Sequence, residues 1–191
     1  PMIKVIEGDI FSQDGIPVIT TNLPGVHGAG LAQQAKNKGL ITQGDGSFKI
    51  TDNVIQLPVK GKNASSRKPG KGAYSESVTG ENVELLKEGL REIIKYAKKN
   101  TTKIILLPLV GLGHGEGDIN EILPLIISTV KASDNIKLVL PSSDISLGRQ
   151  GTVRSDNTKN NLEQIKKALK EANLIPKENN SPELEEDPFK C

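Results

Sequence analysis

The sequence predicts an α/β fold, in which a mostly parallel sheet lies between helices. Short apolar runs alternate along the chain with longer amphipathic segments, which is the pattern of strands alternating with helices. Residues 81–99 have apolar residues three or four positions apart, as the buried face of a helix requires: Val83, Leu86, Leu90, Ile93, Ile94 and Ala97. These two observations indicate a sheet that is covered on both faces.

The same pattern gives the expected elements in order. We expect strands near Ile3 to Glu7, Pro17 to Thr21, Val54 to Val59, Lys103 to Pro108 and Ile136 to Leu140. We expect helices near Leu31 to Lys38, Glu81 to Lys99, Ile119 to Lys131 and Asn160 to Asn173. Asp118 followed by Glu121 has the spacing of a capping box, so the third helix should begin directly after Asp118.

Length and composition indicate one domain. The chain has 191 residues and only five aromatic ones, so a core would consist mainly of Ile, Leu and Val. No stretch approaches the roughly 20 apolar residues of a membrane helix, and we expect a soluble, cytoplasmic protein without a membrane partner. The single cysteine, Cys191, excludes an internal disulfide and a structural zinc site of thiolates.

Charge divides the chain into two parts. The net charge is +2, but residues 177–191 hold five acidic and two basic residues, which leaves 18 acidic and 23 basic residues elsewhere. Without residues 177–191 the chain has a net charge near +5, which suits a polyanionic ligand, although an ordinary solvated surface gives the same balance. We expect residues 1–175 to form a single domain with a helix added at about 160–173, and residues 176–191 to form a disordered acidic tail.

Two glycine-rich stretches follow apolar runs and precede helices. "GVHGAG" spans Gly25 to Gly30, and "PLVGLGHGEGD" spans Pro108 to Asp118. A strand, a glycine turn and a helix in that order bring free backbone N–H groups and the positive end of a helix dipole together, which favours binding of a phosphate. The common nucleotide motifs fail, because Ser65, Gln33 and Glu116 stand where those motifs require glycine.

Four segments in order resemble the marker segments of a macro domain. They are "IKVIEGDIF", "VITTNLPGVHGAGLA", "VIQLPVKGKNASSRKP" and "ILLPLVGLGHGEGD", and the resemblance covers about Ile3 to Pro141. The lysine that ends "PVK" is similar to that of the branch with the terminal ADP-ribose protein glycohydrolase and the glycohydrolases that remove ADP-ribose from DNA. The resemblance implies a three-layer fold and ADP-ribose as the ligand.

The resemblance also implies roles for individual residues. Asp9 matches the aspartate that accepts a hydrogen bond from the adenine amino group, although an aspartate after Gly8 is also typical of a turn. Asn22 matches the asparagine that bonds the distal ribose, and Lys60 matches a lysine beside the anomeric carbon C1″. An amine attacks carbon only in its neutral form, which burial or nearby positive charge favours. The expected ADP-ribose-binding residues are Asp9, Ile10, Asn22, His27, Gly28, Ala29, Gly30, Leu31, Val110, Gly111, Leu112, Gly113, His114, Gly115 and Ser142.

Departures from the family pattern concern catalysis more than binding. Ile19 stands where the family often has asparagine, and Gly115 stands where the branch has an acidic residue. Asp118 is displaced from that position and is also the expected helix cap. His27 or His114 could supply a proton instead, since imidazole titrates near neutral pH. The expected catalytic residues are Lys60, Asn22 and His114.

The function expected from the resemblance is hydrolysis of an ADP-ribose adduct by a monomer that needs no cofactor and no metal. Two alternatives stay open. One is an ADP-ribose-1″-phosphate phosphatase, for which His114 is the candidate, and the other is a reader or sink that binds an ADP-ribose-type signal nucleotide without turnover. Nucleic acid is a further possible partner through the basic loop at residues 60–71, which a solvated surface loop explains equally well.

Overall fold

The computed structural model describes residues 3–62, 78–113, 117–142 and 155–177. His114 and Gly115, most of the basic loop, residues 143–154 and the expected tail from residue 178 onward lie outside the described residues. Within the described ranges, no helix is long and apolar enough to cross a membrane.

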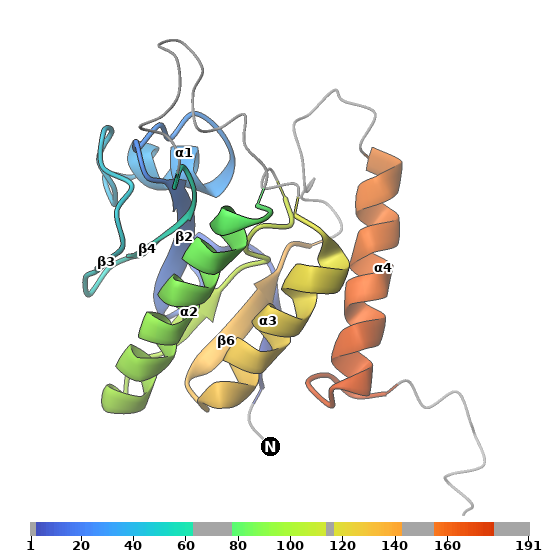
Figure 1. The fold of residues 1–191 in the computed structure, drawn as a ribbon. Coiled ribbons are helices and arrows are strands. Elements are labelled where there is room, and N and C mark those ends of the chain that lie inside the picture. Colours follow the sequence, from blue (N-terminus) through green and yellow to red (C-terminus); the bar gives the residue numbers. More distant parts are fainter. Residues whose placement is uncertain (1–2, 63–77, 114–116, 143–154, 178–191) are drawn as a thin grey trace, which may run out of the picture.

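The elements follow the expected alternation of strands and helices (Figure 1). The strands are β1 (Val5–Glu7), β2 (Ile16–Asn22), β3 (Lys49–Ile50), β4 (Ile55–Lys60), β5 (Ile105–Leu107) and β6 (Ile136–Leu140). The helices are α1 (Gly30–Asn37), α2 (Glu81–Lys99), α3 (Ile119–Ala132) and α4 (Ser155–Glu171), with a 3-10 turn η1 (Ile10–Ser12). The short strand β3 and the turn η1 are additions to the expected elements.

The strands form one mixed sheet in the order β1-β6-β5-β2-β4-β3. Neighbouring strands from β1 to β4 are parallel, and β3 alone pairs antiparallel, with β4. The carboxyl ends of the parallel strands therefore share one edge of the sheet, which lies at the top of Figure 1 near the beginning of α1. The expected mostly parallel α/β sheet is confirmed.

Helices cover both faces, and alternation along β2 explains how. Val18 belongs to the main core, where apolar residues of α2, α3 and α4 pack on the sheet. Ile19, the next residue, points to the opposite face, because successive strand residues alternate. There it packs with Ala35 of α1, Ile41 and Val54. A third cluster of Ile10, Leu106 and Val139 extends this second face toward η1. The fold therefore has three layers.

Local sequence sets the beginning of α3. Asp118 is its N-cap, and the Asp118 carboxylate accepts a hydrogen bond from the backbone N–H of Asn120 at 2.9 Å. The expected helix start after Asp118 is confirmed. This bond uses one carboxylate oxygen of the only acidic side chain described in the second glycine stretch, because Glu116 lies outside the described residues.

The direction of the chain across the sheet reverses between β2 and β5, which are neighbours. From β2 the chain passes through α1 to β4 on one side, and from β5 it passes through α3 to β6 on the other. Open α/β sheets bind ligands outside the carboxyl ends of the strands at such a reversal. Both glycine-rich stretches begin there, since one follows β2 and the other follows β5.

Candidate functional site

The ends of β2 and β4 bring Asn22 and Lys60 together. The two residues are register partners, next to an irregularity in the pairing between Thr21 and Asn22. The backbone N–H of Leu23 donates to the Lys60 carbonyl oxygen at 3.0 Å and so continues the pairing beyond the end of β2. Both Asn22 and Lys60 are only 8% exposed. Two of the expected catalytic residues thus lie on adjacent strands at the carboxyl edge.

The Asn22 side chain holds the loop that follows it. Its Nδ2 donates to the Val26 carbonyl oxygen at 2.9 Å, and its Oδ1 accepts from the Val26 backbone N–H at 2.8 Å. A carboxamide has two N–H donors and two acceptor lone pairs, so one donor and one lone pair are left over. Asn22 can therefore shape the loop and still hydrogen-bond a ligand.

The first glycine-rich stretch ends in an uncapped helix. The N-cap of α1 is Ala29, and no side chain caps the first turn. Free N–H groups and the positive end of the helix dipole at this point attract an anion. A Cβ built on Gly28 would meet no heavy atom within 4 Å, so the space beside this residue is open. The expected contacts Gly28, Ala29, Gly30 and Leu31 all belong to this turn and the start of α1.

The second glycine-rich stretch turns back on itself directly after β5. The Val110 N–H donates to the Pro108 carbonyl oxygen, and the Gly117 N–H donates to the Gly111 carbonyl oxygen, both at 2.8 Å. Gly111 has φ +75°, a conformation that favours glycine. Val110 is buried, whereas Leu112 and Gly113 are half-buried. β5 runs parallel to β2 and pairs with its first two residues, Ile16 and Pro17, so the stretch after β5 leads toward the same edge of the sheet as the rest of β2.

Asp9, Ile10 and Ser142 lie at the other end of the same edge. The Gly8 N–H donates to the Leu140 carbonyl oxygen at 2.9 Å, which joins the residues after β1 to the end of β6. The Asp9 carboxylate accepts from the Phe11 N–H at 3.0 Å and from Ser12 Oγ at 3.1 Å, so it caps η1 and is also exposed. Ser142 is half-buried, and the Ile10 side chain belongs to the core.

The expected site residues form a row along the sheet edge. Its members follow β1, β6, β5, β2 and β4 in that spatial order. Neighbouring strands lie about 4.8 Å apart, so the four steps from β1 to β4 span about 19 Å. A row of this length fits an elongated ligand with its two ends near Asp9 and Lys60.

His27 is placed differently from its neighbours in the first stretch. Its side chain is fully buried, and Nε2 lies 2.8 Å from the Thr42 carbonyl oxygen. This partner was not predictable from the sequence, because residues 38–48 show no periodic pattern. The three glycines among them, Gly39, Gly44 and Gly46, were the available signal of a close backbone approach.

Metal-binding side chains do not gather in this row. Over the described residues, no group of three or more His, Cys, Asp or Glu side chains has the arrangement of a metal site. Among the described residues, the carboxyl edge carries backbone N–H groups, the Asn22 amide and Lys60, with the Asp9 carboxylate at its β1 end. Such a set suits binding of an anion with attached sugars.

Solved structures of other proteins share this fold at low sequence identity. A macrodomain of Thermus aquaticus DarG gives a TM-score of 0.50 at 18% identity, covering 74% of this chain and 98% of its own. Thermosipho africanus DarTG in complex with ADP-ribose gives a TM-score of 0.51 at 20% identity, and the match covers 79% of this chain and 43% of the DarTG chain. An alphavirus P23pro-zbd structure gives a TM-score of 0.58 at 16% identity, and the match covers 91% of this chain and 24% of the viral chain.

No protein-family model matches the sequence, and no curated protein matches it either. This chain spans less than half of the DarTG chain and about a quarter of the viral one, so the likeness concerns one part of each. Identities of 16–20% establish architecture rather than activity. The three-layer sheet and the likeness to the DarG macrodomain lead to one conclusion: this chain has the macrodomain fold.

Proposed function

We propose that this chain binds ADP-ribose or a close derivative and hydrolyses an ADP-ribose adduct. The observation that carries the proposal is the pairing of Asn22 with Lys60 at the sheet edge, next to the reversal point where both glycine-rich stretches begin. The DarTG neighbour was solved with ADP-ribose, and the row from Asp9 to Lys60 suits a ligand of this shape.

In the proposed binding mode, the adenine lies at the β1 end of the row and the distal ribose at the β4 end. Asp9 accepts a hydrogen bond from the adenine amino group, with Ile10 and Ser142 nearby. The diphosphate lies between the N-terminus of α1 and the turn after β5, where backbone N–H groups supply the donors. Asn22 uses its remaining donor and lone pair on the distal ribose hydroxyls.

In the proposed reaction, Lys60 attacks C1″ of the distal ribose through its neutral amine. The new Nζ–C1″ bond forms as the bond from C1″ to the attached group breaks, and the leaving group takes the electron pair and the proton that Nζ loses on forming its new bond. Water then attacks C1″, the Nζ–C1″ bond breaks, and the amine is regenerated. The products are free ADP-ribose and the released group.

A non-catalytic reader or sink is the second candidate, and one observation favours it. Asp118 is the only acidic side chain described in the second stretch, and its carboxylate is engaged as the cap of α3. A protein that only binds ADP-ribose would need the same contacts with the ligand but no acidic side chain for catalysis. The phosphatase alternative depends on His114, which lies outside the described residues.

One experiment separates these functions. The protein is incubated with ADP-ribosylated protein, ADP-ribosylated DNA and ADP-ribose-1″-phosphate, and free ADP-ribose is measured for each, while calorimetry measures binding of ADP-ribose itself. Release from a protein or DNA adduct is expected. Tight binding with no release from any adduct leaves the sink, release from the phosphate alone indicates the phosphatase, and absence of binding contradicts all three.

A further inference from the structure

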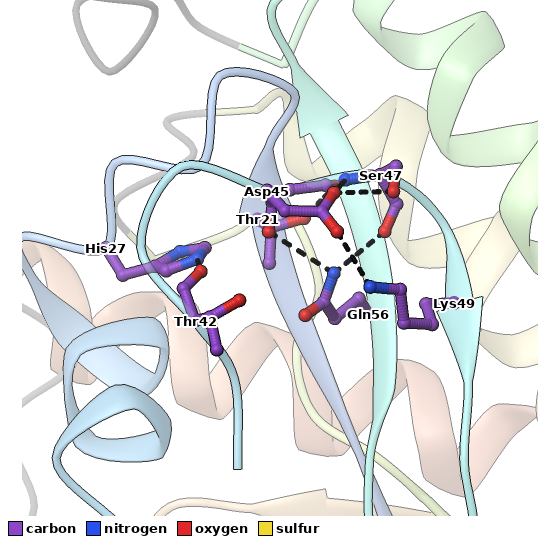
Figure 2. Close-up of polar contacts among 8 residues, drawn as sticks. Thr21, His27, Thr42, Asp45, Ser47, Lys49 and Gln56 are labelled. Carbon is purple, nitrogen blue, oxygen red and sulfur yellow. Dashed lines mark hydrogen bonds and ion pairs between the residues drawn. The ribbon is translucent and has the colours of Figure 1, made fainter. Parts of the chain in front are cut away.

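A second segment supports the loop between β2 and α1. We define the glycine loop as residues 23–29 and the supporting segment as residues 38–48, which connects α1 to β3. Figure 2 shows side chains of the supporting segment next to Thr21 at the end of β2 and His27 of the glycine loop. The supporting segment contributes none of the residues expected to contact ADP-ribose. Its contacts with the glycine loop nevertheless involve most of that loop's length.

Backbone hydrogen bonds join the two segments. The Gly44 N–H donates to the Gly25 carbonyl oxygen at 2.9 Å, and the Gly46 N–H donates to the Leu23 carbonyl oxygen at 3.3 Å. The hydroxyl of Thr21 donates to the Gly46 carbonyl oxygen at 2.7 Å. A Cβ built on Gly25 would overlap the Asp45 backbone, and a Cβ built on Gly46 would overlap the Asn22 carbonyl. The two backbones are therefore in direct contact.

His27 adds the one side-chain bond from the glycine loop to the supporting segment within the described residues. A carbonyl oxygen can only accept, so the 2.8 Å contact with Thr42 requires the proton on His27 Nε2. In the neutral ring Nδ1 is then a bare acceptor, and it is buried without a hydrogen-bond partner among the described residues. The His27 backbone N–H also donates to Gln43 Oε1 at 3.3 Å.

The supporting segment is itself held in place. The Asp45 carboxylate accepts from the Ser47 backbone N–H at 3.0 Å and from Ser47 Oγ at 2.6 Å, and it pairs with Lys49 at 2.7 Å. Gln56 of β4 donates to the Ser47 carbonyl oxygen at 2.9 Å (Figure 2). The glycine loop is thus held near its middle from two sides: Asn22 of β2 bonds Val26, and Thr42 of the supporting segment bonds His27.

We propose that His27 is a positioning residue: its Nε2–H holds the glycine loop on the supporting segment in the shape that presents the N–H groups of Gly28 to Gly30 to the diphosphate. The proposal rests on the proposed function, because the ligand is the one proposed above. The His27 ring is 0% exposed, so it neither contacts the ligand nor donates a proton to it. This role differs from the direct contact and the proton donation that the sequence suggested.

Two substitutions of similar size test which ring nitrogen matters. The amide nitrogen of glutamine reaches the position of Nε2, whereas asparagine reaches only the position of Nδ1. We therefore expect His27→Gln to bind ADP-ribose within about threefold of the native protein, and His27→Asn to bind it at least about tenfold more weakly, because a single hydrogen bond is worth about that factor. The reverse ranking would overturn the proposal, since it would make Nδ1 the functional atom.

The pH profile of hydrolysis tests proton donation separately. Glutamine does not titrate, so the profile of His27→Gln should keep both limbs of the native profile if His27 only positions the loop. Loss of one limb in His27→Gln would make His27 the proton donor and overturn the proposal.

A ligand-free measurement separates failure of this proposal from failure of the proposed function. Long-range ¹H–¹⁵N correlation spectra of the native protein should show Nε2 protonated and Nδ1 bare, and amide exchange at Gly44 should be slow in the native protein and faster in His27→Asn. A proton on Nδ1, or equal Gly44 exchange in both proteins, contradicts the positioning role even if ADP-ribose binds. If ADP-ribose does not bind the native protein, the proposed function fails, and the proposal that rests on it fails with it. The expected spectra would then still show that His27 anchors the loop.

Discussion

Asn22 and Lys60 are register partners at the ends of two parallel strands, and the Leu23 N–H bonds the Lys60 carbonyl oxygen just beyond them. Adjacent strands lie about 4.8 Å apart, so under the proposed binding mode a ribose held by the Asn22 amide would lie next to the strand that carries Lys60. The pairing joins a group that can position a sugar to a group that can react with it.

Substitution of Lys60 should separate turnover from binding. We expect Lys60→Ala to lower the release of ADP-ribose from an adduct by more than about a hundredfold, because the nucleophile is lost. Calorimetry should find most of the affinity for free ADP-ribose retained, since backbone N–H groups hold the diphosphate in the proposed binding mode. Lys62→Ala is the matched control, because Lys62 is exposed and pairs only loosely with Glu88 at 3.4 Å; it should keep full turnover.

Lys60→Arg distinguishes attack from charge. A guanidinium remains protonated at any working pH and cannot attack carbon, so this variant should be as inactive as Lys60→Ala. Measurable turnover by the arginine variant would mean that position 60 acts through its positive charge alone.

Gly28→Ala should weaken ADP-ribose binding without changing stability. A Cβ at this position meets nothing in the ligand-free protein, so the thermal midpoint should stay within about 1 °C. The methyl group would occupy the space proposed for the diphosphate, and we expect an affinity loss of at least about tenfold by calorimetry. Unchanged affinity would place the ligand elsewhere. Gly46→Ala should instead lower the midpoint, because its Cβ overlaps the Asn22 carbonyl.

Asp9→Ala should affect one part of the ligand. We expect affinity for ADP-ribose to fall far more than affinity for ribose phosphate, because in the proposed binding mode only the adenine contacts this carboxylate. The variant should also lose about 1 kcal/mol of stability, since Asp9 caps η1. Calorimetry with both ligands decides the assignment, and equal losses for the two would refute it.

Asp45 should make the protein more sensitive to acid. Hydrogen bonds from Lys49 and Ser47 lower the pKa of Asp45 below its ordinary value. A carboxyl group whose pKa is lower in the folded state stabilises the fold above its unfolded pKa, near 3.9, and that stabilisation is lost as pH falls toward the folded value. Asp45→Asn should therefore be less stable than the native protein near neutral pH. The difference in thermal midpoint should shrink as pH falls below about 4, and a constant difference would contradict this.

Ile19→Asn should destabilise the fold. Ile19 is 0% exposed and packs with Ala35, Ile41 and Val54, so an amide there would be buried among apolar groups. We expect a loss of about 2–4 kcal/mol in urea unfolding, against about 0.5–1.5 kcal/mol for the control Ile19→Val. An unchanged free energy of unfolding for Ile19→Asn would mean that this position accepts a polar residue.

The sequence predicted the fold where its physical signals were strong. The apolar strands, the apolar face of α2 and the helix cap at Asp118 can all be recognised from the order of residues along the chain. The strand β3 was missed because two residues show no periodicity, and η1 was missed because one turn shows none. The expected strand ends lie within two residues of the observed ones, and those of β6 coincide with them, since pairing partners rather than propensity decide where a ladder stops.

The site was predictable in its residue types but not in its contacts. The register of Asn22 against Lys60 is a property of two strands, and a single sequence does not contain it. Burial of His27 depends on residues 38–48, whose backbone approach is seen only after folding. Ile19 was noted as a departure from the family pattern, and its apolar neighbours now explain why it is not an asparagine.

Both outer strands of the described sheet are very short, which limits the pairing of strands from other chains with its edges. β1 has three residues and β3 has two, so each border offers few unpaired backbone groups to an incoming strand. On β3, Lys49 is exposed and forms an ion pair with Asp45, which places charged groups on that border. Lateral growth of the sheet into fibres or through strand exchange is therefore disfavoured at both borders.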